Sequence, residues 1–195
     1  MVIEIMSQLR ITGGYLKGRK IATLDGSVAR YTSSKVREAA FNIIGDVKGK
    51  RVLDLYAGSG SFSIEAISRG AKEATCVESS GEMAGLLRNN AALLSINKYC
   101  QVLCMDVRYA IPFLYGKRSG YDIIFMDPPY EKGYIGETMR LLKAHDAVYS
   151  RNATILLEYS KREILDPLCR EWCTDVATRR YGDTVITILE PAIAT

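Results

Sequence analysis

Four short apolar segments of the chain each end in an acidic residue, and no other feature constrains the fold as strongly. Stretches of helical length separate these segments, which lie near residues 51–55, 73–78, 101–106 and 121–126. Such alternation is typical of a parallel, doubly wound sheet, in which the carboxyl ends of the strands share one edge. The acids that end the segments are Asp54, Glu78, Asp106 and Asp127. We therefore expect them to converge on one crevice, although each alone could instead cap the helix after it.

The rest of the chain extends this α/β pattern. A fifth strand is predicted near residues 153–158. Two further β-rich segments, 174–181 and 184–189, are separated by a Gly-Asp pair and predict a final hairpin that adds an antiparallel strand. We expect one catalytic domain over residues 50–195, with residues 1–49 forming a basic hairpin and a helix packed on it.

The segment after the first strand predicts a nucleotide-type turn. Residues 51–62 read as a strand, a loop with two glycines and the start of a helix. A dinucleotide site would favour Gly or Ala where the chain has Ser63, and it would not favour Asp54 beside a pyrophosphate. We therefore expect a ligand that carries positive charge. Glu78 follows Gly60 by 18 residues, the approximate offset at which a carboxylate binds ribose hydroxyls.

The segment Asp127-Pro128-Pro129-Tyr130 follows a strand and suits a planar amine. Two prolines remove two N–H donors, so the backbone there accepts hydrogen bonds and hardly donates them. A carboxylate and a carbonyl that accept both N–H bonds of a nucleobase amine would turn its lone pair toward an electrophile, and Tyr130 could stack on the base. The alternative is an ordinary turn after a strand.

A ligand with a sulfonium, an ammonium, a ribose and an adenine amine would use such acids well, and S-adenosylmethionine has all four. On these motifs the chain resembles the class I, Rossmann-like methyltransferases from about residue 50 to residue 190. The resemblance implies that Asp54, Gly58 and Gly60 flank the methionine part, that Glu78 binds the ribose and that Asp106 lies by the adenine. The cofactor-binding residues that it implies are Asp54, Tyr56, Gly58, Gly60, Glu78 and Asp106. The residues that it implies for holding the target amine are Asp127, Pro128, Pro129 and Tyr130.

Two motifs near the amino terminus sharpen this resemblance. Residues 10–20 and 32–44 resemble the opening motifs of the bacterial 16S ribosomal RNA guanine-N2 methyltransferase family. Two positions differ from the family pattern, because Tyr31 stands where proline is usual and Ser34 where aspartate is usual. Ser34 can still cap the helix that follows. The resemblance implies that ribosomal RNA is the substrate, either alone or within a small-subunit particle.

The same segment carries the formal net charge of the chain. Between Arg10 and Arg37 there are seven Lys or Arg and one acid, whereas the rest has 19 basic and 21 acidic residues. Glycines between these cations predict a short hairpin that presents charge at the surface. The residues that we predict to contact RNA phosphates are Arg10, Lys17, Arg19, Lys20, Lys35 and Arg37. A solvated basic face is the alternative. In the helix after the hairpin, Lys35 and Arg37 fall off the apolar stripe and are expected to face the cleft or solvent.

The remaining composition predicts a cytoplasmic enzyme without a metal. The five cysteines form no Cys-x-x-Cys pair and His145 is the only histidine, so we expect buried thiols and no zinc site. No apolar run is long enough to span a membrane, and no signal peptide is apparent. We expect a monomer.

We therefore predict direct methyl transfer from S-adenosylmethionine to the exocyclic N2 amine of an unpaired or flipped guanine in 16S ribosomal RNA. The guanine follows from the resemblance. Methylation of adenine N6 in DNA or RNA is an alternative within the same fold, and a glutamine side chain is a less favoured target. A non-catalytic RNA-binding ribosome assembly factor is the alternative from another class.

Overall fold

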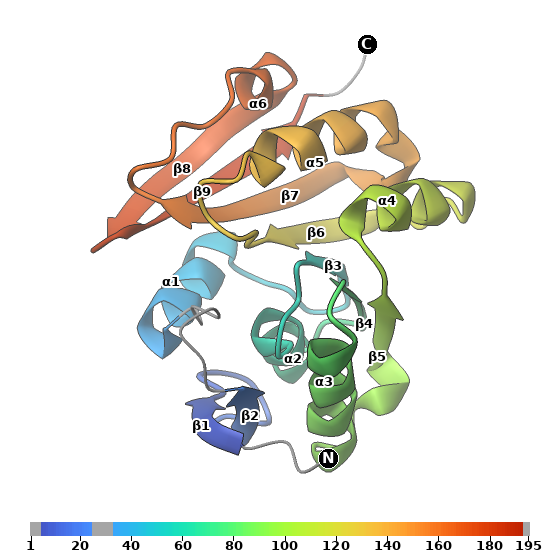
Figure 1. The fold of residues 1–195 in the computed structure, drawn as a ribbon, viewed down its shortest axis with the longest axis vertical. Coiled ribbons are helices and arrows are strands. Elements are labelled where there is room, and N and C mark those ends of the chain that lie inside the picture. Colours follow the sequence, from blue (N-terminus) through green and yellow to red (C-terminus); the bar gives the residue numbers. More distant parts are fainter. Residues whose placement is uncertain (1–4, 25–32, 193–195) are drawn as a thin grey trace.

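A computed structural model describes residues 5–24 and 33–192. Figure 1 shows a twisted central sheet with helices on both faces and a small two-stranded hairpin set apart from it. The strands are β1 (Ile5–Arg10), β2 (Lys20–Leu24), β3 (Arg51–Leu55), β4 (Glu73–Glu78), β5 (Cys100–Cys104), β6 (Tyr121–Met126), β7 (Tyr149–Ser160), β8 (Cys173–Tyr181) and β9 (Thr184–Pro191). The helices are α1 (Ser34–Ile44), α2 (Ser61–Ser68), α3 (Gly81–Leu93), α4 (Val107–Gly116), α5 (Tyr134–Ala144) and α6 (Leu168–Glu171), with short 3-10 turns η1 (Asn97–Tyr99) and η2 (Asp146–Val148).

The large sheet has the order β5-β4-β3-β6-β7-β9-β8. Its first five strands are parallel, whereas β9 pairs antiparallel with β7 and β8. The predicted doubly wound sheet and its carboxyl-terminal hairpin are thus confirmed, although the hairpin adds two strands rather than one. The order reverses between β3 and β6, which is where ligands bind in such sheets.

Helices cover both faces of the sheet. In Figure 1, α1, α2 and α3 lie on one face and α4 and α5 on the other. Each layer has its own apolar core: the rings of Phe41, Phe62 and Phe125 contact one another in tilted and edge-on arrangements in the first, and Ile111 and Met139 are fully buried in the second. The central parallel strands β3, β4 and β6 are consequently buried on both faces, which explains their nearly continuous apolar sequence.

The amino-terminal hairpin packs on the outer side of α2 and α3, as Figure 1 shows. Strands β1 and β2 pair antiparallel, which confirms the predicted hairpin. The loop between them docks on the end of α2, where Tyr15 N donates to the Ser68 carbonyl over 2.9 Å. Gly14 has φ +74°, and a Cβ there would lie 1.8 Å from the same carbonyl oxygen. Only glycine permits this approach.

Helix α1 begins differently from the prediction. Its cap is Ser33, whose Oγ accepts a hydrogen bond from Val36 N over 3.2 Å, and Ser34 is the first helical residue. The predicted Ser34 cap is therefore wrong by one residue, although the helix itself is confirmed. Tyr31, the other position that differs from the family pattern, lies outside the described residues.

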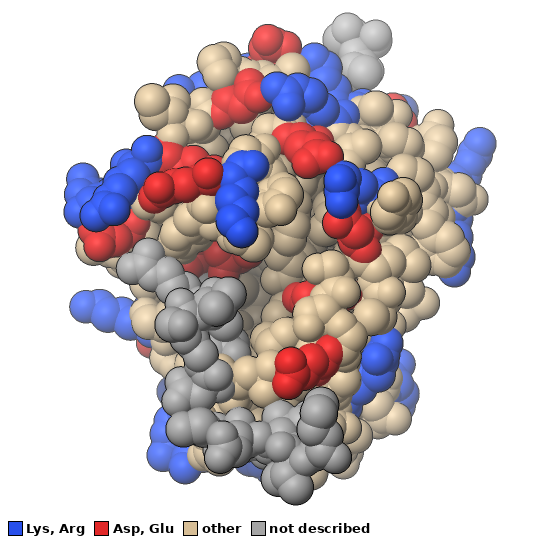
Figure 2. Space-filling model, viewed as in Figure 1, with Lys and Arg blue, Asp and Glu red and all other residues tan. Residues whose placement is uncertain are grey.

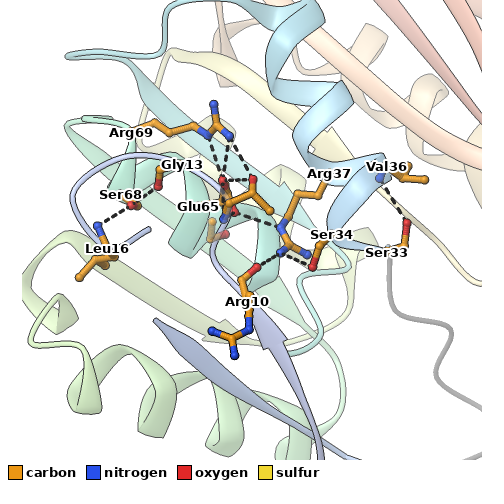
Figure 3. A network of polar contacts seen from close by, with 12 residues as sticks. Arg10, Gly13, Leu16, Ser33, Ser34, Val36, Arg37, Glu65, Ser68 and Arg69 are labelled. Atoms are coloured by element: carbon orange, nitrogen blue, oxygen red, sulfur yellow. Dashed lines mark hydrogen bonds and ion pairs between the residues drawn. The ribbon is translucent and has the colours of Figure 1, made fainter. Parts of the chain in front are cut away.

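Arg37 is 1% exposed, so the prediction that it faces the cleft or solvent and contacts RNA is wrong. Its Nε lies 3.2 Å from an Oε of the fully buried Glu65 on α2. Arg69 reaches the same carboxylate at 2.9 Å, and Thr12 donates to it through both N and Oγ. Figure 3 shows the two guanidinium groups approaching Glu65 from different sides. The network joins the hairpin, α1 and α2.

Within the described ranges, no helix is both long and apolar enough to cross a membrane. The same residues contain no group of three or more potential metal ligands. All five cysteines are free thiols, and four of them are buried while Cys104 is exposed. His145 ends α5, where its Nδ1 lies 2.8 Å from the Leu141 carbonyl and its ring meets Tyr115 edge-on.

Candidate active site

Glu78 organises the glycine loop at the end of β4. One carboxylate oxygen accepts a hydrogen bond from Gly58 N over 2.9 Å, and the other accepts from Ser80 N over 2.7 Å. Each oxygen has a second lone pair, and the side chain lines a pocket at the carboxyl edge of the sheet. Glu78 can therefore hold the loop and bind a pair of ligand hydroxyls at once.

Asp54 is used differently from the other strand-end acids. It is buried, and its Oδ2 accepts hydrogen bonds from Ser63 Oγ at 2.5 Å and Ser63 N at 3.2 Å. Burial raises the pKa of Asp54 to about 7, against the opposing hydrogen bonds from Ser63. The Asp54 carboxylate thus fixes the first turn of α2. Asp54 is not among the residues that line the pocket. Gly60, which caps α2, has φ +83°, and a Cβ there would lie 2.7 Å from Leu87 Cγ.

The pocket at this edge brings together residues from five elements or their loops. It is lined by Tyr56, Val77, Glu78, Ser79, Asp106, Val107, Arg108, Pro129, Tyr134 and Glu137. Tyr56 sits at φ +69°, in the left-handed region, and its hydroxyl lies 2.7 Å from Thr138 Oγ1 on α5. Figure 2 shows acidic side chains in and beside a hollow near the middle of this face. The convergence expected from the sequence is therefore observed for Glu78 and Asp106.

Asp106 caps α4, so the alternative of a helix cap is confirmed for this residue, which also lines the pocket. Its Oδ1 accepts from Arg108 N at 2.8 Å, and Arg108 Nη2 pairs with Oδ2 at 2.9 Å. Hydrogen bonding to Arg108 is the main reason that the pKa of Asp106 is lowered, so the group stays ionised. Because Asp106 and Arg108 both line the pocket, they offer an acceptor and a donor to the planar edge of a base.

The Asp127-Pro128-Pro129-Tyr130 segment forms one wall of the same pocket through Pro129. Pro128 is buried and Asp127 half-buried at the end of β6. Burial raises the pKa of Tyr130, and the charges of Asp127 and Glu158 raise it further. The phenol therefore stays protonated and can donate to Glu158 Oε1 at 3.4 Å.

Glu158 is a residue that the sequence reasoning missed. Met126 on β6 pairs with Leu157 on β7, so the next residues, Asp127 and Glu158, lie at adjacent strand ends. Glu158 is only 2% exposed and its charge acts on Tyr130. The signal was present, because Glu158 ends the predicted strand 153–158 just as the other acids end theirs.

The predicted RNA-binding residues other than Arg37 are exposed. Arg10, Lys17, Arg19 and Lys20, the hairpin cations, lie on β1, β2 and the loop between them. Lys35 is exposed on the first turn of α1. These cations remain available to phosphates, whereas Arg37 serves the buried network.

Comparison with known proteins gives the family. Residues 9–190 match the family described as "Conserved hypothetical protein 95". The Escherichia coli (strain K12) protein "Ribosomal RNA small subunit methyltransferase D" is 36% identical over 137 residues, which cover 70% of this chain and 67% of that protein. The chain belongs to this family. It is the small-subunit ribosomal RNA methyltransferase D family that the amino-terminal motifs resemble.

Solved structures confirm the fold. The Escherichia coli protein "Putative methyltransferase yhhF" superposes with a TM-score of 0.82 at 28% identity, over 96% of this chain and all of that one. A second protein, "SMU.776, a putative methyltransferase complexed with SAH", superposes with a TM-score of 0.72 at 18% identity, over 88% of this chain and 53% of that one. The predicted class I methyltransferase fold is thereby confirmed.

Proposed function

We propose that this protein transfers a methyl group from S-adenosylmethionine to the exocyclic N2 amine of a guanine in small-subunit ribosomal RNA. One observation carries the proposal: Pro129 of the amine-holding motif lines the same pocket as Glu78 and Asp106. The proposed site for the methyl donor and the proposed site for the target amine are therefore adjacent in one pocket. The family, whose Escherichia coli member is named a small-subunit ribosomal RNA methyltransferase, supports the substrate class.

The residues of the pocket fit the cofactor in kind. Glu78 offers carboxylate oxygens to ribose hydroxyls, while the backbone N–H of Gly58 fixes that carboxylate. Asp106 and Arg108 suit the adenine edge, and Tyr56 and Asp54 shape the loop beside the methionine part. When bound, S-adenosylmethionine supplies an electrophilic methyl group on a sulfonium.

Positioning of the amine then provides most of the catalysis. Asp127 and the Pro128 carbonyl accept the two N–H bonds of the target amine, which directs its lone pair into the shared pocket. Transfer would join the methyl carbon to the target nitrogen, the thioether product would leave with the S–C bonding pair, and the amine would become cationic. Asp127 stabilises this charge, and the proton leaves afterwards, so no strong base is required. Tyr130, whose phenol stays protonated, holds the base ring.

Analysis of nucleosides tests the proposal. We expect mass spectrometry of 16S ribosomal RNA from cells lacking the gene to show the loss of one N2-methylguanosine, which the wild-type gene restores. Loss of N6-methyladenosine would instead identify the adenine alternative. Unchanged modification in both strains, with purified protein that binds RNA, would favour the non-catalytic assembly factor.

A further inference from the structure

A second pocket lies at the opposite edge of the sheet from the candidate active site. Its volume is about 460 Å³, within the range of pockets that hold small ligands, about 300–1,000 Å³. The lining includes Arg51, Glu73, Lys98, Tyr99, Lys117 and Arg118. Because these residues begin β3 and β4 or directly precede β5 and β6, the pocket lies at the amino ends of parallel strands. We call it the amino-edge pocket.

Positive charge dominates this pocket. Among the described residues that line it, Glu73 is the one acid. Arg51 pairs with Glu73 at 2.6 Å and also donates to the Ser119 carbonyl. The other three cations, Lys98, Lys117 and Arg118, are exposed. In the part of the chain that the structure describes, no carboxylate forms an ion pair with any of these three. The pocket therefore presents three cationic groups that are not neutralised.

Local structure holds these cations beside the pocket. Lys98 Nζ lies 4.7 Å from the ring centre of Tyr99, and Lys117 Nζ lies 4.3 Å from that of Phe113. Such contacts orient an ammonium group without neutralising it. Arg118 has φ +48°, a left-handed conformation that is uncommon for a residue with a side chain and that clusters at ligand sites.

The amino-terminal hairpin carries a further aromatic ring whose titration senses this pocket. Burial raises the pKa of Tyr15, the charge of Tyr99 raises it further and the charge of Lys98 lowers it. Tyr15 is 65% exposed in the hairpin loop and Tyr99 is 40% exposed. The exposed Tyr99 ring therefore lies with Lys98 in the lining of the pocket, and the hairpin loop presents a second exposed ring at Tyr15.

We propose that the amino-edge pocket binds phosphates of a second RNA segment, distinct from the segment that delivers the target base. Lys and Arg groups without carboxylate partners match phosphate oxygens, and the exposed tyrosine rings can stack on bases or sugars. Since the pocket and the active site lie at opposite edges of the sheet, a substrate that reaches both must fold around the protein, as ribosomal RNA can. This inference rests on the proposed RNA substrate but not on which base is methylated.

Salt-dependent binding of a 16S ribosomal RNA fragment tests the inference. The variant carries Lys98→Gln, Lys117→Gln and Arg118→Gln. We expect the slope of log affinity against log salt to become less negative by about 2–3, and affinity near 0.1 M salt to fall by about 10- to 100-fold. The charge-preserving variant Lys98→Arg, Lys117→Arg, Arg118→Lys should keep the wild-type slope. Each single Gln variant should make the slope less negative by about 1, so each cation can also be tested by itself.

A matched control separates local contact from net charge. The variant Lys143→Gln, Arg151→Gln, Arg170→Gln removes equal charge from exposed positions of α5, β7 and α6 and should leave the slope close to wild type. S-adenosylmethionine affinity, measured by calorimetry, should be unchanged throughout. If the pocket variants keep the wild-type slope, the inference is overturned while RNA methylation stands. Wild-type protein that binds RNA through this pocket but never methylates it would instead overturn the proposed function alone.

Discussion

The buried carboxylate of Glu65 should be the most costly polar group to alter outside the active site. Glu65 is fully buried and receives hydrogen bonds or ion pairs from Thr12, Arg37 and Arg69, with N···O distances of 2.9–3.2 Å. The change Glu65→Gln keeps the shape but removes the carboxylate that pairs with the 1%-exposed Arg37 and with Arg69. Breaking a buried ion pair in this way costs about 3–5 kcal/mol. Since small domains have about 5–15 kcal/mol of stability, this is a large fraction.

Urea unfolding measures the effect. We expect the free energy of unfolding to fall by about 3–5 kcal/mol in Glu65→Gln. The matched control is Glu171→Gln, because Glu171 pairs with Lys143 at 3.4 Å but both side chains are about half exposed. It should cost less than about 1 kcal/mol. A Glu65→Gln protein within about 1 kcal/mol of wild type would refute the reasoning that this network ties the hairpin to α2.

The same network predicts a pH dependence. Burial alone would raise the pKa of Glu65, but the hydrogen bonds from Thr12, the charge of Arg37 and a hydrogen bond from Arg69 lower it overall. A lowered pKa in the folded state gives stability that is present at neutral pH and is lost as pH falls through that pKa. The wild-type protein should therefore lose this contribution in acid, and Glu65→Gln should lack that part of the acid sensitivity.

Three further changes test the site. Glu78→Ala should weaken S-adenosylmethionine binding by about 1–3 kcal/mol in calorimetry, whereas Glu73→Ala, at the other end of β4, should not change it. The raised pKa of Asp54, about 7 against an ordinary 3.8, means that the folded state holds a proton which the unfolded state releases, so this site lowers stability as pH rises from about 4 to 7. Asp54→Asn should remove that decline in urea unfolding, and an unchanged pH profile would contradict it. Neutralising the hairpin cations together should make the salt slope of RNA binding less negative by about 3 without changing cofactor affinity, and an unchanged slope would show them to be a solvated face.

The strand-end acids show how much of this site a sequence can predict. Apolar periodicity places strands, and the rule that parallel strands share a carboxyl edge brings Glu78 and Asp106 to the same crevice, with Pro129 of the segment after β6 beside them. The same rule applied to the fifth strand would have found Glu158. Local pattern therefore predicts both the sheet and the place of the site.

Contacts between distant segments were harder to predict. Arg37 lies off the apolar stripe of α1 and reads as a surface cation, but Glu65, 28 positions later, provides a buried partner. Asp54 lies one residue before the end of β3, and its buried carboxylate is bound by the nearby Ser63 rather than directed to the pocket. In both cases a buried partner side chain, and not the position along the helix or strand, decides whether the residue faces RNA or cofactor. Periodicity contains no information about such partners.

The single-turnover methylation rate of Asp127→Ala tests the central claim most directly. The claim is that Asp127 holds the target amine against a pocket that other residues build for the cofactor. With saturating RNA, the rate should fall by on the order of 10²-fold or more, while calorimetry shows S-adenosylmethionine affinity close to wild type. A folded Asp127→Ala protein that methylates ribosomal RNA at the wild-type rate, or one that loses cofactor affinity in proportion to its rate, would contradict the claim.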